Sequence, residues 1–176
     1  MWSGALGTNK DSNIVITGFM GTGKSTVGKL VAEKLGRPYL DTDEEIVRRI
    51  GMSISEVFER DGEERFRHIE RRMCRFLAAQ GGYVISTGGG MLVDESNREV
   101  MLASGFVVCL NATPEAIAER LKADKTERPL LKGDWRTLLV KRQPSYAEIP
   151  NQVDTTGKTP ETIAGEIIQL WQKVSV

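Results

Sequence analysis

Short apolar runs alternate along the chain with stretches whose apolar residues recur at helical spacing. The apolar runs end at glycine or at polar residues and predict strands at 13–17, 38–41, 83–87, 106–110 and 152–155. The run at 106–110, FVVCL, is apolar throughout, which is typical of a strand buried on both faces of a sheet. Because helical stretches separate the runs, the pattern predicts an α/β fold with a parallel sheet covered on both faces.

The helical stretches fill the segments between these runs. In the first of them, Val27, Leu30, Val31 and Leu35 follow one helical face, and Gly36 ends it. Further helices are expected at about 44–50, 55–61, 63–80 and 94–104, from 113 onward, at 135–148 and from 159 onward. The segment 122–134 is charged and has no apolar period, so we expect a mobile surface segment there.

Charge balance and cysteine content argue against several classes of protein. The chain has 176 residues, and its 24 Lys and Arg are matched by 24 Asp and Glu, so no net positive charge favours a nucleic-acid or membrane partner. Two cysteines and one histidine are too few for a disulfide framework or a Cys/His zinc site. No apolar run reaches the roughly 18 residues that span a membrane, and residues 1–13 lack the features of a targeting leader. We therefore expect one soluble, cytoplasmic, monomeric domain over 1–176, with its core at 13–172.

A glycine-rich loop follows the first expected strand. The residues GFMGTGKS fit the phosphate-loop pattern G-x-x-x-x-G-K-[ST] between a strand and a helix, which makes a chance glycine-rich turn a poor alternative. Gly18, Gly21 and Gly23 let successive backbone N–H groups point at phosphate oxygens, and the helix adds its positive end. Lys24 can reach the β- and γ-phosphates, and the Ser25 hydroxyl can bind Mg²⁺. The loop predicts a nucleoside triphosphate site, and the chain length favours a small-molecule or nucleotide kinase.

Two carboxylates lie at the end of the second expected strand. Asp41 and Asp43 are spaced to point the same way from an extended segment, toward the phosphate loop. Phosphoryl transfer needs one carboxylate near magnesium and one to orient or deprotonate the attacking hydroxyl. The alternative is that Asp43 caps a helix that begins at Glu44 and that Asp41 is a turn residue.

The helix expected at 63–80 places Arg67 between two carboxylates. Glu63 and Glu70 fall at the edge of the apolar stripe, at helical spacings that let both pair with Arg67. An arginine braced in this way is held in one orientation, which suits bidentate binding of a ligand carboxylate. The alternative is a ladder of ion pairs on the surface.

Three consecutive glycines and two later arginines complete the candidate chemistry. Gly88, Gly89 and Gly90 follow a buried strand, where they allow a substrate to approach the backbone and offer unhindered N–H donors. A plain tight turn would need only one glycine. Arg128 in the charged segment could cover the transferring phosphoryl group as part of a lid, and Arg142 follows on the next helix. The alternative for the segment is a merely solvated loop.

Taken together, these motifs resemble the shikimate kinase family over residues 13–170. The matching pieces are GFMGTGKSTVGK, LDTDEEI, SISEVFERDGEERFRHIE, STGGG, RPLL and KRQPSY. The phosphate loop is shared with very many proteins, whereas DTD, FR-x-x-E and GGG at these spacings are far more specific. The resemblance implies a three-layer P-loop kinase fold with about five parallel strands, a substrate-binding helical region at about 43–80 and a lid at about 122–134.

The resemblance also implies an activity and a set of site residues. The activity is phosphorylation of the 3-hydroxyl of shikimate by ATP and Mg²⁺, giving shikimate 3-phosphate and ADP in aromatic amino-acid biosynthesis. Asp43, Lys24 and Arg128 would be catalytic, and Asp41 would reach magnesium through water beside Ser25. The residues implied for shikimate are Asp43, Arg67, Gly88, Gly89, Gly90 and Arg142. Those implied for ATP are Gly21, Thr22, Gly23, Lys24, Ser25, Thr26, Arg120, Arg128 and Lys158.

Two other functions remain as alternatives. Another kinase of small hydroxy acids, such as a gluconate kinase, shares the loop and the size but does not explain DTD together with Arg67 and the triple glycine. A catalytically silent homologue would be expected to have lost Lys24, Asp43 or an arginine, and the sequence keeps all of them.

Overall fold

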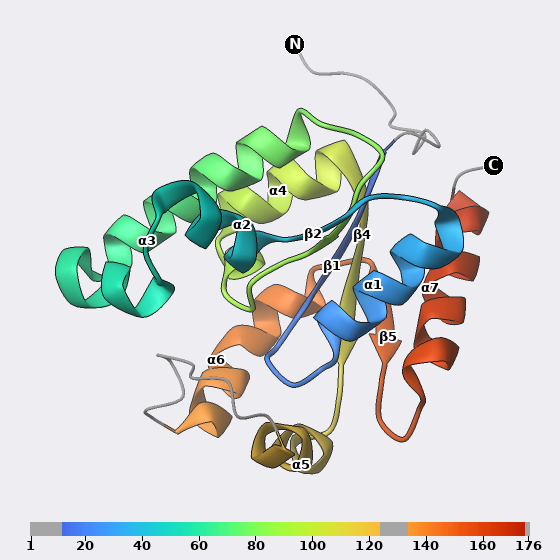
Figure 1. Ribbon diagram of the computed structural model, residues 1–176. Coiled ribbons are helices and arrows are strands. Elements are labelled where there is room, and N and C mark those ends of the chain that lie inside the picture. The colour runs from blue at the N-terminus through green and yellow to red at the C-terminus, as the bar shows by residue number, and fades with distance from the viewer. Residues whose placement is uncertain (1–11, 124–133, 175–176) are drawn as a thin grey trace.

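A computed structural model of the protein describes residues 12–123 and 134–174. Five parallel strands form one sheet in the order β2-β3-β1-β4-β5 (Figure 1). The strands are β1 (Asn13–Gly18), β2 (Tyr39–Asp41), β3 (Val84–Ser86), β4 (Gly105–Asn111) and β5 (Asn151–Asp154). The predicted parallel sheet of five strands is confirmed, and no strand end differs from expectation by more than one residue.

The helices also lie where the apolar period predicts them. They are α1 (Lys24–Leu35), α2 (Thr42–Ile50), α3 (Ile54–Ala78), α4 (Glu95–Ser104), α5 (Pro114–Ala123), α6 (Trp135–Ala147) and α7 (Pro160–Val174), with a short 3₁₀ helix, η1 (Met91–Val93), that the sequence did not predict. The helices expected at 55–61 and 63–80 run on as one element, α3. Its backbone is not helical at Gly62 (φ 82°, ψ 169°), which marks the expected break. Most of the predicted lid, including Arg128, lies outside the described residues.

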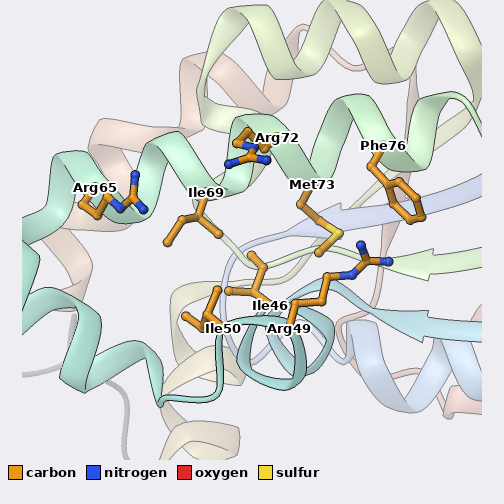
Figure 2. Close-up of a pocket in the computed structure, with 8 residues that line it drawn as sticks. All are labelled: Ile46, Arg49, Ile50, Arg65, Ile69, Arg72, Met73 and Phe76. Carbon is orange, nitrogen blue, oxygen red and sulfur yellow. The ribbon is translucent and has the colours of Figure 1, made fainter.

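A groove runs between α2 and α3 at the edge of the molecule (Figure 2). Its volume is about 330 Å³, and its lining combines apolar side chains with three arginines: Ile46, Arg49, Ile50, Arg65, Ile69, Arg72, Met73 and Phe76. The Arg49 guanidinium covers the ring of Phe76 at 4.2 Å from the ring centroid. The lining includes no residue that the sequence assigns to a substrate or nucleotide.

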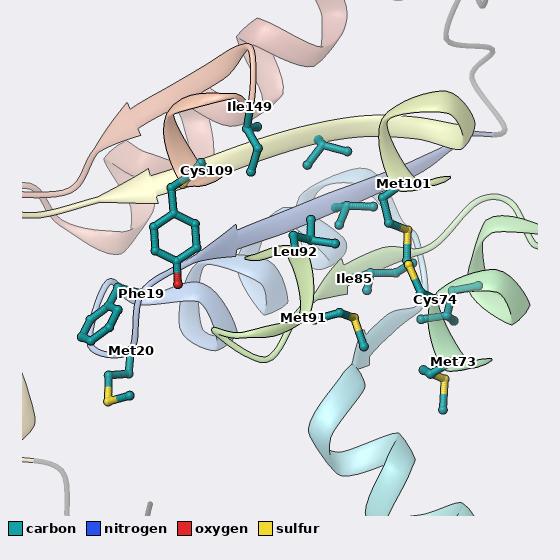
Figure 3. Packing of buried hydrophobic residues seen from close by; sticks show 14 of the residues in the cluster. Phe19, Met20, Met73, Cys74, Ile85, Met91, Leu92, Met101, Cys109 and Ile149 are labelled. Atoms are coloured by element: carbon teal, nitrogen blue, oxygen red, sulfur yellow. The ribbon is translucent and has the colours of Figure 1, made fainter. Parts of the chain in front are cut away.

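Alternate residues of β1 face two separate layers of helices. Ile14 and Ile16 pack with α1 and α7 on one face of the sheet. Val15 points to the other face, where α2 to α6 and η1 contribute to a second cluster (Figure 3). Because both faces are covered, all six residues of β1 are buried. The run at 106–110, predicted to be buried on both faces, is also buried, in β4. Among the described helices, none is both long and apolar enough to cross a membrane.

The close approach of α1 to the sheet depends on Gly28. A Cβ there would lie 2.5 Å from Ser86 Oγ and 2.8 Å from Tyr39 Cε2. Gly28→Ala should therefore lower the free energy of unfolding by about 1–3 kcal/mol, because overpacking outweighs the gain of up to about 1 kcal/mol in helix propensity.

Gly165→Ala in α7 is the matched control, since a Cβ at that position meets nothing within 4 Å. It should raise the free energy of unfolding by about 0.5–1 kcal/mol. Urea denaturation of both variants measures the difference. Equal effects of the two substitutions would show that α1 has room to move away from the sheet.

Candidate active site

The loop between β1 and α1 holds the predicted phosphate-binding motif. Gly18 has φ 138°, and a Cβ there would lie 2.3 Å from the Leu110 carbonyl oxygen of β4, so only glycine fits. Gly23 has φ 94° and precedes α1 directly, without a side chain that caps the first turn. The N–H groups of that turn, which contains Ser25 and Thr26, therefore form the kind of helix end that binds anions.

Two polar side chains of the loop turn back onto one of its own carbonyls. The Thr22 hydroxyl donates to the Phe19 carbonyl at 2.7 Å, and Lys24 Nζ donates to the same oxygen at 2.9 Å. Gly21, with φ 77°, allows the turn between them. Lys24 can exchange this bond for a phosphate oxygen by rotating its flexible side chain.

Asp41 ends β2 and caps α2. Its Oδ1 accepts hydrogen bonds from the N–H groups of Asp43 at 2.9 Å and Glu44 at 3.3 Å. The helix therefore begins at Thr42, so Asp41 rather than Asp43 is the cap. The expectation that both carboxylates project from one extended segment is wrong, because Asp43 lies in the first helical turn. The Asp41 Oδ2 accepts a hydrogen bond from Ser25 Oγ at 3.0 Å, which brings together the two predicted magnesium-side oxygens.

The triple glycine at 88–90 packs against charged side chains of other elements. A Cβ on Gly88 would lie 2.5 Å from Asp43 Oδ1, and a Cβ on Gly90 would lie 2.5 Å from Arg67 Nη1. None of the three glycines has a positive φ, so the backbone conformation does not require glycine there. Glycine is required for steric reasons, because a side chain at Gly88 or Gly90 would displace a residue that is predicted to bind the substrate, Asp43 or Arg67.

The central glycine contacts a third charged group. A Cβ on Gly89 would lie 3.3 Å from Arg142 Nη1 and 3.5 Å from the carbonyl oxygen of the phosphate-loop residue Gly18. The Tyr146 hydroxyl donates to the Gly89 carbonyl at 2.6 Å. The Gly88 N–H donates to Thr42 Oγ1 at 2.9 Å, so the expectation that all three glycines offer free donors is wrong at this position.

The predicted brace around Arg67 is present. Arg67 Nη1 pairs with Glu70 Oε2 at 2.6 Å, and Nη2 pairs with Glu63 Oε1 at 3.0 Å. Glu70 is only 1% exposed, which excludes the alternative of a simple surface ladder. Burial raises the pKa of Glu70 to about 7, an effect that Arg67 opposes and the nearby Asp43 increases.

Arg142 links the triple glycine to the phosphate loop. It projects from α6, is 5% exposed, and lies with its guanidinium 5.8 Å from the centroid of the Phe19 ring. Sequence reasoning missed Phe19 as a neighbour of this arginine, because no periodicity joins the phosphate loop to the helix at 135–148. It also missed Tyr146, although Tyr146 follows Arg142 by four residues in that helix, a spacing that places both on one face. Burial raises the pKa of Tyr146 to about 12, so this side chain acts as a neutral hydrogen-bond donor.

Arg120 and Lys158, which the family resemblance assigns to the nucleotide, are both found near the loop that follows β5. Arg120 Nη1 donates to the Gly21 carbonyl at 3.1 Å and to Thr155 Oγ1 at 2.9 Å, so it bridges the phosphate loop and the loop after β5. The Lys158 ammonium pairs with Glu166 of α7 at 2.9 Å.

Comparison with known proteins agrees with this arrangement. The family model described as shikimate kinase matches residues 20–172. The shikimate kinase of Geobacter sulfurreducens is 47% identical over 88% of each chain, and that of Thermodesulfovibrio yellowstonii is 44% identical over 93% of this chain and 96% of its own.

Solved structures give the same relationship. Shikimate kinase from Acinetobacter baumannii in complex with shikimate superposes with a TM-score of 0.85, at 38% identity, over 92% of this chain and 93% of its own. A gluconokinase from Sinorhizobium meliloti reaches a TM-score of 0.59 at 20% identity over 94% of this chain and 97% of its own, which shows a shared fold only. The chain therefore belongs to the shikimate kinase family.

Proposed function

We propose that the protein transfers the γ-phosphoryl group of ATP to the 3-hydroxyl of shikimate, giving shikimate 3-phosphate and ADP in aromatic amino-acid biosynthesis. The observation that carries this proposal is the convergence of Asp43, Arg67 and Arg142 on one glycine turn that also touches the phosphate loop. The family of the chain supports it, as does the likeness to a kinase solved with shikimate.

Arg67 and Arg142 bind the carboxylate of shikimate in this proposal. A guanidinium group offers two parallel N–H donors to a carboxylate, which fixes both the position and the orientation of the ligand. Glu63 and Glu70 orient Arg67, and burial against Phe19 orients Arg142. Both arginines are therefore preorganised before the substrate arrives.

Asp43 orients the 3-hydroxyl and accepts its proton. It faces Gly88 at the rim of the turn, in the first turn of α2. A carboxylate at this place can hold the attacking oxygen in line with the phosphoryl group and remove its proton as the new P–O bond forms.

ATP binds along the phosphate loop. Lys24 leaves the Phe19 carbonyl for the transferring phosphate, and Arg128 approaches the same group. The residues proposed for the nucleotide are Gly21, Thr22, Gly23, Lys24, Ser25, Thr26, Arg120, Arg128 and Lys158. Ser25 would hold Mg²⁺, with Asp41 behind a bound water, and the ion would neutralise charge on the β- and γ-phosphates.

ADP release from MgATP with shikimate tests the function directly, with gluconate and no acceptor as controls. Turnover that depends on shikimate is the expected result. Turnover with gluconate alone would keep the kinase and overturn the substrate pocket. ATP binding without turnover on either acceptor would favour a catalytically silent homologue.

Asp43→Asn keeps the shape of the side chain and removes its charge and basicity. It should lower kcat by on the order of 10²–10⁴ if Asp43 orients or deprotonates the hydroxyl. Steady-state kinetics give kcat, and fluorescence titration with ATP checks that nucleotide binding persists. Near-normal turnover would remove Asp43 from the mechanism.

Arg67→Ala should raise the Kd for shikimate by on the order of a hundredfold, or about 3 kcal/mol, because it removes a charged partner of the ligand carboxylate. Isothermal titration calorimetry measures this effect. Arg65→Ala is the matched control, since Arg65 is an exposed arginine of the same helix that lines the groove of Figure 2. Equal affinities in the two variants would show that the carboxylate binds elsewhere.

A further inference from the structure

Arg98 in α4 is a buried charge that the proposed reaction does not use. It is 6% exposed, and burying a guanidinium costs free energy unless partners compensate for the lost water. Its Nη1 donates to the carbonyls of Leu92 at 2.9 Å and Val93 at 3.1 Å, and its Nη2 pairs with the carboxylate of Glu148. Arg98 therefore joins two segments outside its own helix.

The first of these segments is η1, which directly follows the triple glycine. Asn97, the neighbour of Arg98 in α4, donates to the Met91 carbonyl at 2.9 Å. Two adjacent side chains of α4 thus donate hydrogen bonds to all three carbonyls of η1. The Tyr146 hydroxyl of α6 donates to the Gly89 carbonyl. The glycine turn is held between α4 and α6.

The second segment is the C-terminal end of α6. Glu148 is the residue that follows this helix as its C-cap, and Arg142 and Tyr146 lie in its last turns. Arg142 Nη1 lies 3.3 Å from the Cβ position of Gly89, so a small separation of the helix from the turn would change this contact. The Arg98–Glu148 pair connects these two segments, which carry or adjoin residues proposed to bind shikimate.

We propose that Arg98 is a positioning residue for shikimate binding. It holds the glycine turn and the end of α6 at a fixed separation, so that Arg142 lies against Gly89 and faces the ligand carboxylate. This inference rests on the proposed function. The phosphate loop lies between β1 and α1, and its side-chain hydrogen bonds run to Phe19 and Asp41 rather than to the Arg98–Glu148 pair, so we expect nucleotide binding not to depend on that pair.

Two variants of the full chain test the role. Arg98→Met removes the charge and all three bonds but keeps much of the buried volume. Glu148→Ala removes the carboxylate together with one methylene group, from a side chain that is 62% exposed. This variant is therefore expected to fold even if Arg98→Met does not. Calorimetry with shikimate and with ADP, in conditions where urea denaturation shows each variant folded, measures the two affinities.

The expected result is a rise in the shikimate Kd on the order of tenfold in each variant, with the ADP Kd unchanged. Arg71→Met is the matched control, because it breaks an arginine–carboxylate pair between α3 and Asp94, the N-cap of α4, at 3.3 Å, and this pair does not connect the glycine turn to α6. This control should bind shikimate like the parent chain.

A parent-like shikimate Kd in folded Arg98→Met or Glu148→Ala would overturn the positioning role and leave the proposed function standing. An equal loss of affinity for shikimate and ADP would also overturn it, since that pattern indicates general destabilisation. Failure of the parent chain itself to bind shikimate would overturn the proposed function, and the positioning role with it.

Discussion

Three consecutive positions without a side chain decide how the charged groups of the site can pack. At Gly88 and Gly90, a Cβ would stand 2.5 Å from the Asp43 carboxylate and from the Arg67 guanidinium. Because the glycines have no side chains, the negative charge of Asp43 from α2 and the positive charge of Arg67 from α3 can both pack against one turn. Glu70 lies buried beneath them, with a pKa raised by its burial, and pairs with Arg67. Any larger residue in the turn would push these groups apart.

The order of the strands brings that turn to the phosphate loop. In a parallel sheet the carboxyl ends of neighbouring strands meet at one edge. β3 lies between β2 and β1, so the glycines that follow it lie between Asp41, which ends β2, and the loop that follows β1. The proposed acceptor side and nucleotide side of the site are therefore adjacent because of topology, and the Cβ position of Gly89 lies 3.5 Å from the Gly18 carbonyl oxygen.

Features that depend on local spacing could be predicted from the sequence, and features that depend on distant packing could not. The strands, the phosphate loop and the brace around Arg67 all follow from patterns among residues that are close together in the sequence. The alternative of a helix cap named Asp43 instead of Asp41, because either aspartate could fill that role locally. The Arg98–Glu148 pair joins residues 50 positions apart, and no periodicity connects them.

Calorimetric titration of a Gly90→Ala variant with shikimate tests the account most directly. Gly90 has φ −91° and ψ −16°, which alanine adopts readily, and the atom in the way is the end of the flexible Arg67 side chain. The variant should therefore fold with a nearly unchanged unfolding midpoint and bind ADP normally. The shikimate Kd is expected to rise on the order of tenfold or more, because the displaced Arg67 no longer faces the ligand carboxylate. A folded variant that binds shikimate as tightly as the parent chain would contradict the account.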